Sequence, residues 1–217
     1  MKRQINYGLV ASSLLIMMML FSGIASANAD TTVITEKERL ELANELWGTD
    51  ITYGEYIQQL FPEAYNKCPD QATKEYYNMK VAWMDPSTKN SESEKTFTAS
   101  SENTKTIYFG AADSDLSFTG SKITYKTWQR MVLPTPFTKI SSMTILTHLW
   151  RDDGDEEIVG VKYKQGSNVY KLEAKGTYSY SSPAYYCVIG QYSGVYPAGT
   201  TPQSYNGVDS TGWTYVS

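Results

Sequence analysis

An acidic run provides the first residues that could do chemistry. Five carboxylates occur within the six residues from Asp152 to Glu157. Carboxylate oxygens are ligands that Ca²⁺ prefers, so Asp152, Asp153 and Asp155 are candidate calcium ligands, although the spacing of an EF-hand loop is absent. Asp-Asp-Gly-Asp is also a sequence that turn geometry alone favours, and a solvated turn is the alternative interpretation. Calcium is the one cofactor that the sequence suggests, and no cofactor is required by it.

His148 is the only histidine of the chain. A histidine that acts as a general base needs a nucleophile and an orienting acid, and the chain has no Gly-x-Ser-x-Gly nucleophile motif. We therefore name no catalytic residue and expect a protein that is not an enzyme. A secreted hydrolase that uses carboxylates, assisted by Ca²⁺, is kept as the alternative, because the distance between two carboxylates depends on the fold.

The two cysteines, Cys68 and Cys187, lie far apart in the chain. An exported protein can form a disulfide between them. Such a bridge closes a loop of roughly 100 residues and, in the chain-entropy treatment, stabilises the fold by about 4 to 5 kcal/mol. Two unpaired buried thiols are the alternative. Without histidines nearby, the pair does not predict a zinc site.

An aromatic segment follows the second cysteine. Residues 191–207 are rich in Tyr, Gly, Pro and Ser/Thr and are predicted to form a long loop. Aromatic rings with a polar edge suit sugar rings and protein partners, so we expect Tyr192, Tyr196, Tyr205 and Trp213 to contact an envelope glycan or a surface protein. The alternative is a loop whose own tyrosines pack over the end of the fold.

The N terminus predicts export. Lys2 and Arg3 precede an apolar run over residues 9–24, and the small residues Ala25-Ser26-Ala27-Asn28-Ala29 follow. This order is that of a secretory signal peptide, which we expect over residues 1–29 and expect to be cleaved. An uncleaved anchor helix is the alternative, and the run is shorter than the roughly 20 residues that such a helix needs.

Charge and hydropathy bear on the partners. The net charge is −4 and no run of Lys or Arg occurs, so the sequence offers no electrostatic reason to expect nucleic acid or an anionic membrane as partner. No apolar run after the signal peptide is long enough to span a bilayer, and we expect no stable membrane insertion after cleavage. The predicted location is outside the cell, either released or associated with the envelope.

The residues that follow the signal peptide read as helices. Thr35 and Glu38 form a capping-box pattern, and apolar residues then recur at helical spacing up to Trp47. Thr52 is expected to cap a second helix and Asp70 a third that extends to about residue 83. We expect residues 30–84 to form a helical segment that packs on the rest of the chain, followed by a polar linker over residues 85–94.

From residue 95 onward the pattern changes to many short strands separated by turns. The clearest pair is a hairpin, in which Met143, Ile145 and Leu149 share one face of the first strand and Val159 and Val161 alternate on the return. Strands without intervening helices predict antiparallel sheets. The expected fold is mainly β: an antiparallel β-sandwich over residues 95–217, preceded by the helical segment.

The sequence as a whole predicts a secreted, non-enzymatic binding or structural protein of the extracellular space or the envelope. A purely structural surface protein would self-associate and have no soluble ligand. The sequence does not identify the ligand.

Overall fold

The computed structural model describes residues 34–67, 71–88 and 95–217. The predicted signal peptide, Cys68, Asp70 and most of the predicted linker lie outside these residues. The described chain is mainly β, with 55% strand and 16% helix, and it has two antiparallel sheets preceded by a short helical segment. The predicted fold class is therefore confirmed.

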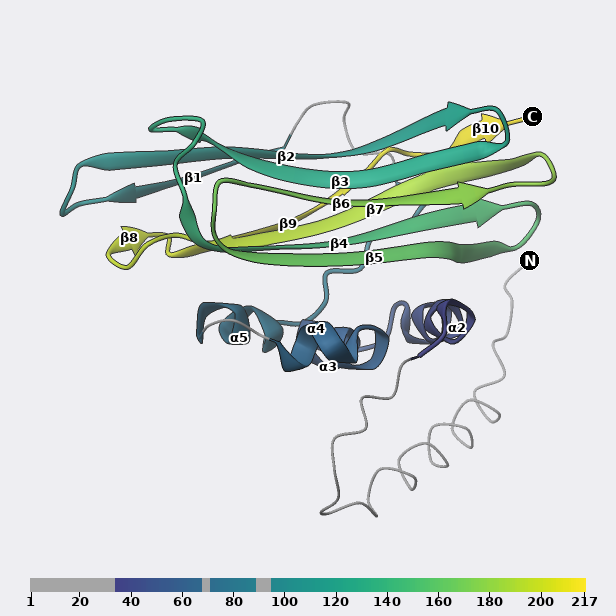
Figure 1. The fold of residues 1–217 in the computed structure, drawn as a ribbon, viewed down its shortest axis with the longest axis horizontal. Coiled ribbons are helices and arrows are strands. Elements are labelled where there is room, and N and C mark those ends of the chain that lie inside the picture. The colour runs from purple at the N-terminus through teal and green to yellow at the C-terminus, as the bar shows by residue number, and fades with distance from the viewer. Residues whose placement is uncertain (1–33, 68–70, 89–94) are drawn as a thin grey trace, which may run out of the picture. The chain divides into compact units, whose positions relative to one another are not determined.

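The strands form two antiparallel sheets (Figure 1). The order of the first sheet is β6-β3-β2-β1-β8, and the order of the second is β10-β7-β4-β5, with β9 also paired to β7. The bounds are β1 Lys95–Ser101, β2 Thr106–Thr119, β3 Lys122–Leu133, β4 Ile140–Asp152, β5 Glu156–Val169, β6 Lys171–Ser179, β7 Ala184–Val195, β8 Thr200–Thr201, β9 Ser204–Ser210 and β10 Thr214–Val216.

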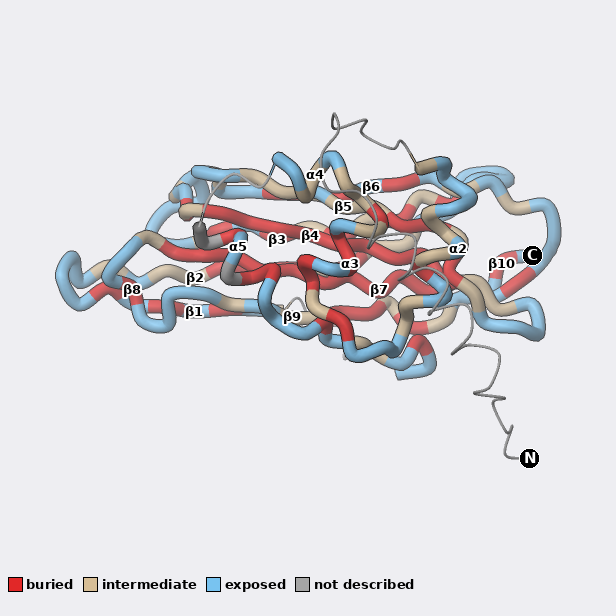
Figure 2. Tube along the Cα trace, turned by 90° about the horizontal axis from the view of Figure 1, so that it is seen from below, coloured by how far each residue is buried: buried red, intermediate tan, exposed pale blue. Residues whose placement is uncertain are grey.

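The second sheet is the middle layer, since the first sheet covers one of its faces and the helices cover the other (Figure 1). Its central strands β4 and β7 are accordingly buried along almost their whole length (Figure 2). Along β4, Met143 and Ile145 face the first sheet, whereas Leu146 and Trp150 face the helices. The face predicted for Met143 and Ile145 is thus confirmed.

The helical layer begins as the capping signals predict. Its elements are α2 Glu36–Leu46, α3 Tyr53–Leu60, α4 Pro62–Asn66 and α5 Gln71–Tyr77. Thr35 with Glu38 and Thr52 with Glu55 both form reciprocal capping boxes. The third predicted helix is shorter than expected, since α5 ends at Tyr77.

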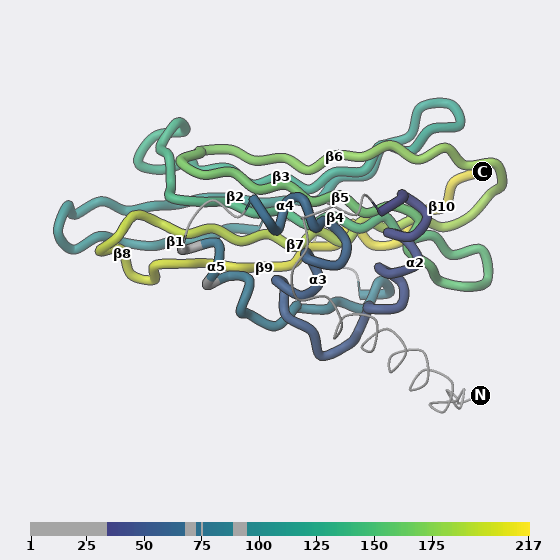
Figure 3. Tube along the Cα trace, turned by 60° about the horizontal axis from the view of Figure 1, so that its bottom comes forward, coloured from purple at the N-terminus to yellow at the C-terminus, as the bar shows by residue number. Residues whose placement is uncertain are grey.

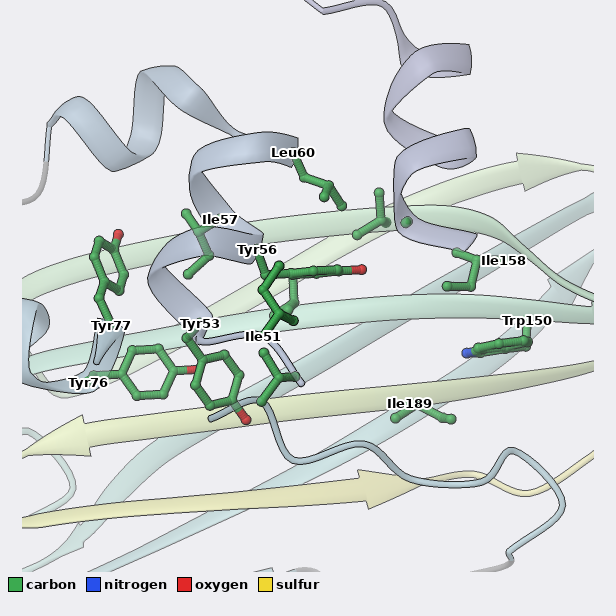
Figure 4. Packing of buried hydrophobic residues seen from close by; sticks show 14 of the residues in the cluster. Ile51, Tyr53, Tyr56, Ile57, Leu60, Tyr76, Tyr77, Trp150, Ile158 and Ile189 are labelled. Atoms are coloured by element: carbon green, nitrogen blue, oxygen red, sulfur yellow. The ribbon is translucent and has the colours of Figure 1, made fainter. Parts of the chain in front are cut away.

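The apolar faces of these helices bury against β4, β5 and β7. Tyr56, Ile57 and Leu60 of α3 belong to one apolar cluster with Trp150, Ile158 and Ile189 of the sheet (Figure 4). Tyr53, Tyr56, Ile57 and Leu60 are almost fully buried. Because α3 has eight residues, it is too short to be stable alone, and this packing holds it on the sheet.

Between the two sheets, a layer of small and polar residues separates two apolar clusters. One apolar cluster contains Met131, Ile145 and Tyr192, and the other contains Tyr125, Leu149 and Val188. On four of the strands, the residue that lies between the two clusters is small or polar. These residues are Ser114 on β2, Thr127 on β3, Thr147 on β4 and Gly190 on β7. Ser114 Oγ and Thr127 Oγ1 are 3.1 Å apart, within hydrogen-bond distance.

Candidate functional site

The aromatic residues expected to contact a ligand lie mainly inside the fold. Residues 191–207 do not form a long loop, because β7 continues to Val195 and β8 and β9 follow. Tyr192 and Tyr196 are buried in the core between the sheets. Tyr205 stacks on Phe97 with 3.7 Å between ring centroids, and its hydroxyl donates to Gln129 Oε1 at 2.7 Å.

Trp213 is half-buried and packs against the cluster beneath the helices. Burial raises the pKa of the Tyr192, Tyr196 and Tyr205 hydroxyls, which keeps them protonated. The structure therefore brings three of the four predicted contact residues together, but their side chains pack in the core between the sheets. This placement agrees with the alternative of tyrosines that pack on their own fold.

The acidic run forms the turn between β4 and β5. Asp152 Oδ1 accepts a hydrogen bond from the Gly154 amide at 2.9 Å, and Arg151 forms ion pairs with Asp153 and Glu157 at 3.1 and 2.7 Å. No group of three His, Cys, Asp or Glu side chains that could hold a metal occurs within the described ranges. Asp152, Asp153 and Asp155 are thus not brought together as the calcium hypothesis requires.

Cys187 is a free, fully buried thiol on β7, so the expected disulfide with Cys68 is absent from the structure. Its Sγ lies 3.2 Å from Ser210 Oγ and 3.8 Å from the Pro86 carbonyl oxygen. These neighbours enclose the thiol beneath the chain that leads out of the helical layer. Cys68 itself lies outside the described residues.

We expect Cys187 to resist alkylation in the folded protein. Burial encloses the thiol and raises its pKa, so little thiolate is available to react. Peptide mapping should find Cys187 unmodified after native alkylation and modified after denaturation without reductant. A requirement for reductant would show that the thiol is oxidised and would contradict this assignment.

His148 lies on the helix-facing side of β4 and is fully buried. Its Nε2 forms a 2.9 Å hydrogen bond with Tyr56 Oη, and the Trp47 ring packs against it at 5.0 Å. Burial lowers the pKa of His148 to about 3, so the imidazole is neutral. With its ring enclosed by Tyr56 of helix α3 and by Trp47, His148 joins the helical layer to the sheet.

Asp113 on β2 and Asp209 on β9 both accept a hydrogen bond from the same backbone amide. The Ser114 amide donates at 2.9 Å both to Asp113 Oδ1 and to Asp209 Oδ2. The described part of β1 pairs with β2 as far as Ala112, and beyond it these two carboxylates accept the hydrogen of the Ser114 amide. Burial, together with the charge of Asp113, raises the pKa of Asp209 to about 6.

A solvent-facing candidate site lies at one corner of the sandwich. The connection between β3 and β4 closes with a turn in which the Thr138 amide donates to the Thr135 carbonyl at 3.0 Å. Proline favours the second position of such a turn, so Pro136 sets the turn and Phe137 occupies its third position. The Phe137 side chain is 70% exposed, the largest value among the exposed large hydrophobic residues.

The bend between β5 and β6 lies beside this turn (Figures 1 and 3). Tyr170 forms the bend, and its carbonyl accepts a hydrogen bond from the Met131 amide of β3 at 2.8 Å. The rings of Phe137 and Tyr170 meet edge to face with centroids 5.4 Å apart. Leu133, at the end of β3, is also exposed.

Three lysines border these apolar residues. Lys139, Lys164 and Lys171 line an open hollow of about 510 Å³, together with Tyr170 and, as its one carboxylate, Glu173. None of the three forms an ion pair with any residue that the structure describes. We refer to Leu133, Phe137, Tyr170, Lys139, Lys164 and Lys171 as the Phe137 patch.

The Phe137 patch combines exposed apolar side chains with lysines. Exposed apolar side chains next to one another are typical of interaction sites. Sequence reasoning missed the patch, because its parts come from three separate stretches of the chain. The one local signal was the Thr-Pro-Phe-Thr sequence, in which a large apolar residue is placed in a turn.

Comparison of the chain with models of protein families, with curated proteins and with solved structures finds no match. Among the described helices, none has the length and apolar character needed to cross a bilayer.

Proposed function

We propose that this chain is an exported, non-enzymatic binding protein that attaches to the cell envelope through the Phe137 patch. Export is supported by the order of basic, apolar and small residues at the N terminus. The helical layer covers one face of the sandwich, so the outer face of the first sheet and the edges and ends of the sheets are the surfaces left for binding.

The observation that carries this proposal is the exposure of Phe137, whose ring contacts Tyr170 and which follows the exposed Leu133 by four residues in the chain. The turn sequence holds Phe137 out in solvent, where its ring contacts Tyr170 but most of its apolar surface stays in water. A surface that covers the ring removes apolar area from water and is favoured by roughly 25 cal/mol per Å² covered. The neighbouring lysines then favour a partner that carries negative charge.

In expressing cells, we expect wild-type protein in the envelope fraction and Phe137→Ser protein released into the medium. The matched control is Tyr215→Ser, because Tyr215 is another exposed aromatic and lies on β10, away from the patch. Intact mass should show a chain that begins at Asn28 or Asp30, after either of the two predicted cleavage sites. A chain that stays inside the cell, or equal retention of both variants, would contradict the proposal.

A second candidate is a secreted hydrolase that uses carboxylates. The observation that favours it is the pair of Asp113 and Asp209 on one amide, with the pKa of Asp209 raised to about 6 by burial and by Asp113. The test is hydrolysis of a glycan or peptide by the wild-type protein. If Asp113→Asn folds but loses this hydrolysis, the hydrolase function replaces the binding function.

A further inference from the structure

We propose that the Phe137 patch binds reversibly to the surface of an anionic lipid bilayer, an inference that rests on the proposed attachment to the envelope. Phe137 and Leu133 would enter the boundary between headgroups and acyl chains. Lys139, Lys164 and Lys171 would contact the lipid phosphates.

The apolar part of the patch fits a lipid boundary. Phe137 is held in a tight turn and Leu133 ends a strand, so both side chains are presented on rigid backbone. Both side chains are exposed, so a surface that covers them from outside would remove apolar area from water. Phe and Leu are among the side chains that enter the membrane interface.

The charged part of the patch selects an anionic surface. The chain as a whole carries a net charge of −4, yet three lysines gather around this one hollow with a single carboxylate among its lining residues. Each lysine near an anionic leaflet strengthens binding by roughly fivefold. The fold thus supplies the basic cluster that the linear sequence lacks.

A lipid surface accounts for more of the patch than the other partners do. The rings of Phe137 and Tyr170 meet at 79°, so the two do not form one flat aromatic platform on which a sugar ring could stack. A wall polymer of phosphates would bind the lysines but would leave the apolar side chains of Phe137 and Leu133 in water. A stable protein partner would cover roughly 800 Å² on this side, far more than one turn and one bend present.

The test uses exported protein purified from expressing cells and vesicles that contain phosphatidylglycerol in phosphatidylcholine, or phosphatidylcholine alone. We expect wild-type protein to sediment with the anionic vesicles and to bind them at least about tenfold more tightly than the neutral ones. Binding should weaken between about 0.05 M and about 0.5 M salt, because the Debye length falls roughly threefold.

Variants separate the two parts of the patch. Lys164→Gln with Lys171→Gln should weaken binding to anionic vesicles about 25-fold, and Phe137→Ser at least about tenfold. The control pair, Lys122→Gln with Lys175→Gln, removes the same charge from exposed positions outside the patch and should change binding less than about twofold. All variants have the same N terminus, so differences in vesicle binding between them come from the patch. Equal binding of the wild-type protein and the patch variants to every vesicle, as a retained apolar N-terminal segment would cause, would contradict the proposal.

The outcomes distinguish this inference from the proposed function. Patch-dependent retention on native envelopes and on vesicles supports both. Patch-dependent retention on envelopes that persists after lipid extraction, without vesicle binding, identifies a polymer or protein partner; it overturns the lipid inference and leaves the proposed function standing. Absence of patch-dependent retention on native envelopes overturns both.

Discussion

Replacing Gly190 with alanine is expected to lower the free energy of unfolding by about 3 kcal/mol. Gly190 belongs to the polar layer between the sheets, and a Cβ atom there would lie 2.1 Å from Thr127 Oγ1 and 2.4 Å from Ser114 Oγ. Both neighbours are buried and hydrogen-bonded to each other, so neither side chain can turn away without losing its partner. The added methyl must push the two sheets apart.

Gly166→Ala is the matched control for this prediction. It also places a Cβ on a strand of the second sheet, but the nearest atom is Val169 Cγ1 at 3.1 Å, which can give by a few tenths of an ångström. Denaturant unfolding should show a loss below about 1 kcal/mol for Gly166→Ala. Equal losses in the two variants would mean that the polar layer is not packed as described.

Stability between about pH 7.5 and pH 5 is expected to include two large contributions that act in opposite directions. His148 has a folded pKa of about 3 against 6.5 for an ordinary histidine, because burial disfavours the imidazolium. The unfolded chain therefore binds the proton more readily, and stability is lost as the pH falls below 6.5. At pH 5 this loss amounts to about 2 kcal/mol.

Asp209 acts in the other direction. Burial, then the charge of Asp113, raises its folded pKa to about 6 from 3.8, while Lys95 and the Ser114 amide partly oppose the shift. The folded chain therefore binds the proton more readily, and stability rises as the pH falls through 6. The gain at pH 5 is about 1.4 kcal/mol, so the wild-type protein should change by less than about 1 kcal/mol.

Single variants should reveal the two hidden contributions. Denaturant unfolding of Asp209→Asn should show a loss of about 2 kcal/mol between pH 7.5 and 5, and His148→Gln a gain of about 1.4 kcal/mol. Measurements above pH 5 avoid Glu38 and Glu55, whose pKa values are lowered by the backbone and side-chain hydrogen bonds with Thr35 and Thr52. A wild-type loss of 2 kcal/mol that His148→Gln does not remove would contradict the buried neutral imidazole.

Local signals predicted helices α2 and α3 and both strands of the central hairpin. The Thr35–Glu38 and Thr52–Glu55 pairs act within one turn of backbone, so their spacing alone marks where α2 and α3 begin. Likewise, alternation along β4 marks its two faces. The expectation that Val159 and Val161 share a face of β5 was wrong, because a register shift opposite Leu149 and Trp150 places them on opposite faces. The end of α5 was predicted less well, because the chain after Tyr77 pairs with residues near Thr52, a contact remote in sequence.

The candidate site could not be predicted because it depends on contacts between distant parts of the chain. Tyr192, Tyr196 and Tyr205 read as surface residues of a loop, but pairing of β9 with β7 turns that segment into a sheet and its rings inward. Conversely, Lys139, Lys164 and Lys171 are isolated lysines in the sequence. The pairing of β4 with β5 and the bend at Tyr170 bring them around one hollow.

The most direct test of the account measures how purified wild-type, Phe137→Ser and Tyr215→Ser proteins bind to isolated envelopes of the expressing cells. Circular dichroism of all three should first show the same fold. We predict saturable binding of the wild-type protein, the same affinity within about twofold for Tyr215→Ser, and at least about tenfold weaker binding for Phe137→Ser. Equal affinities for Phe137→Ser and the wild-type protein would show that attachment does not use the Phe137 patch, and would contradict the account.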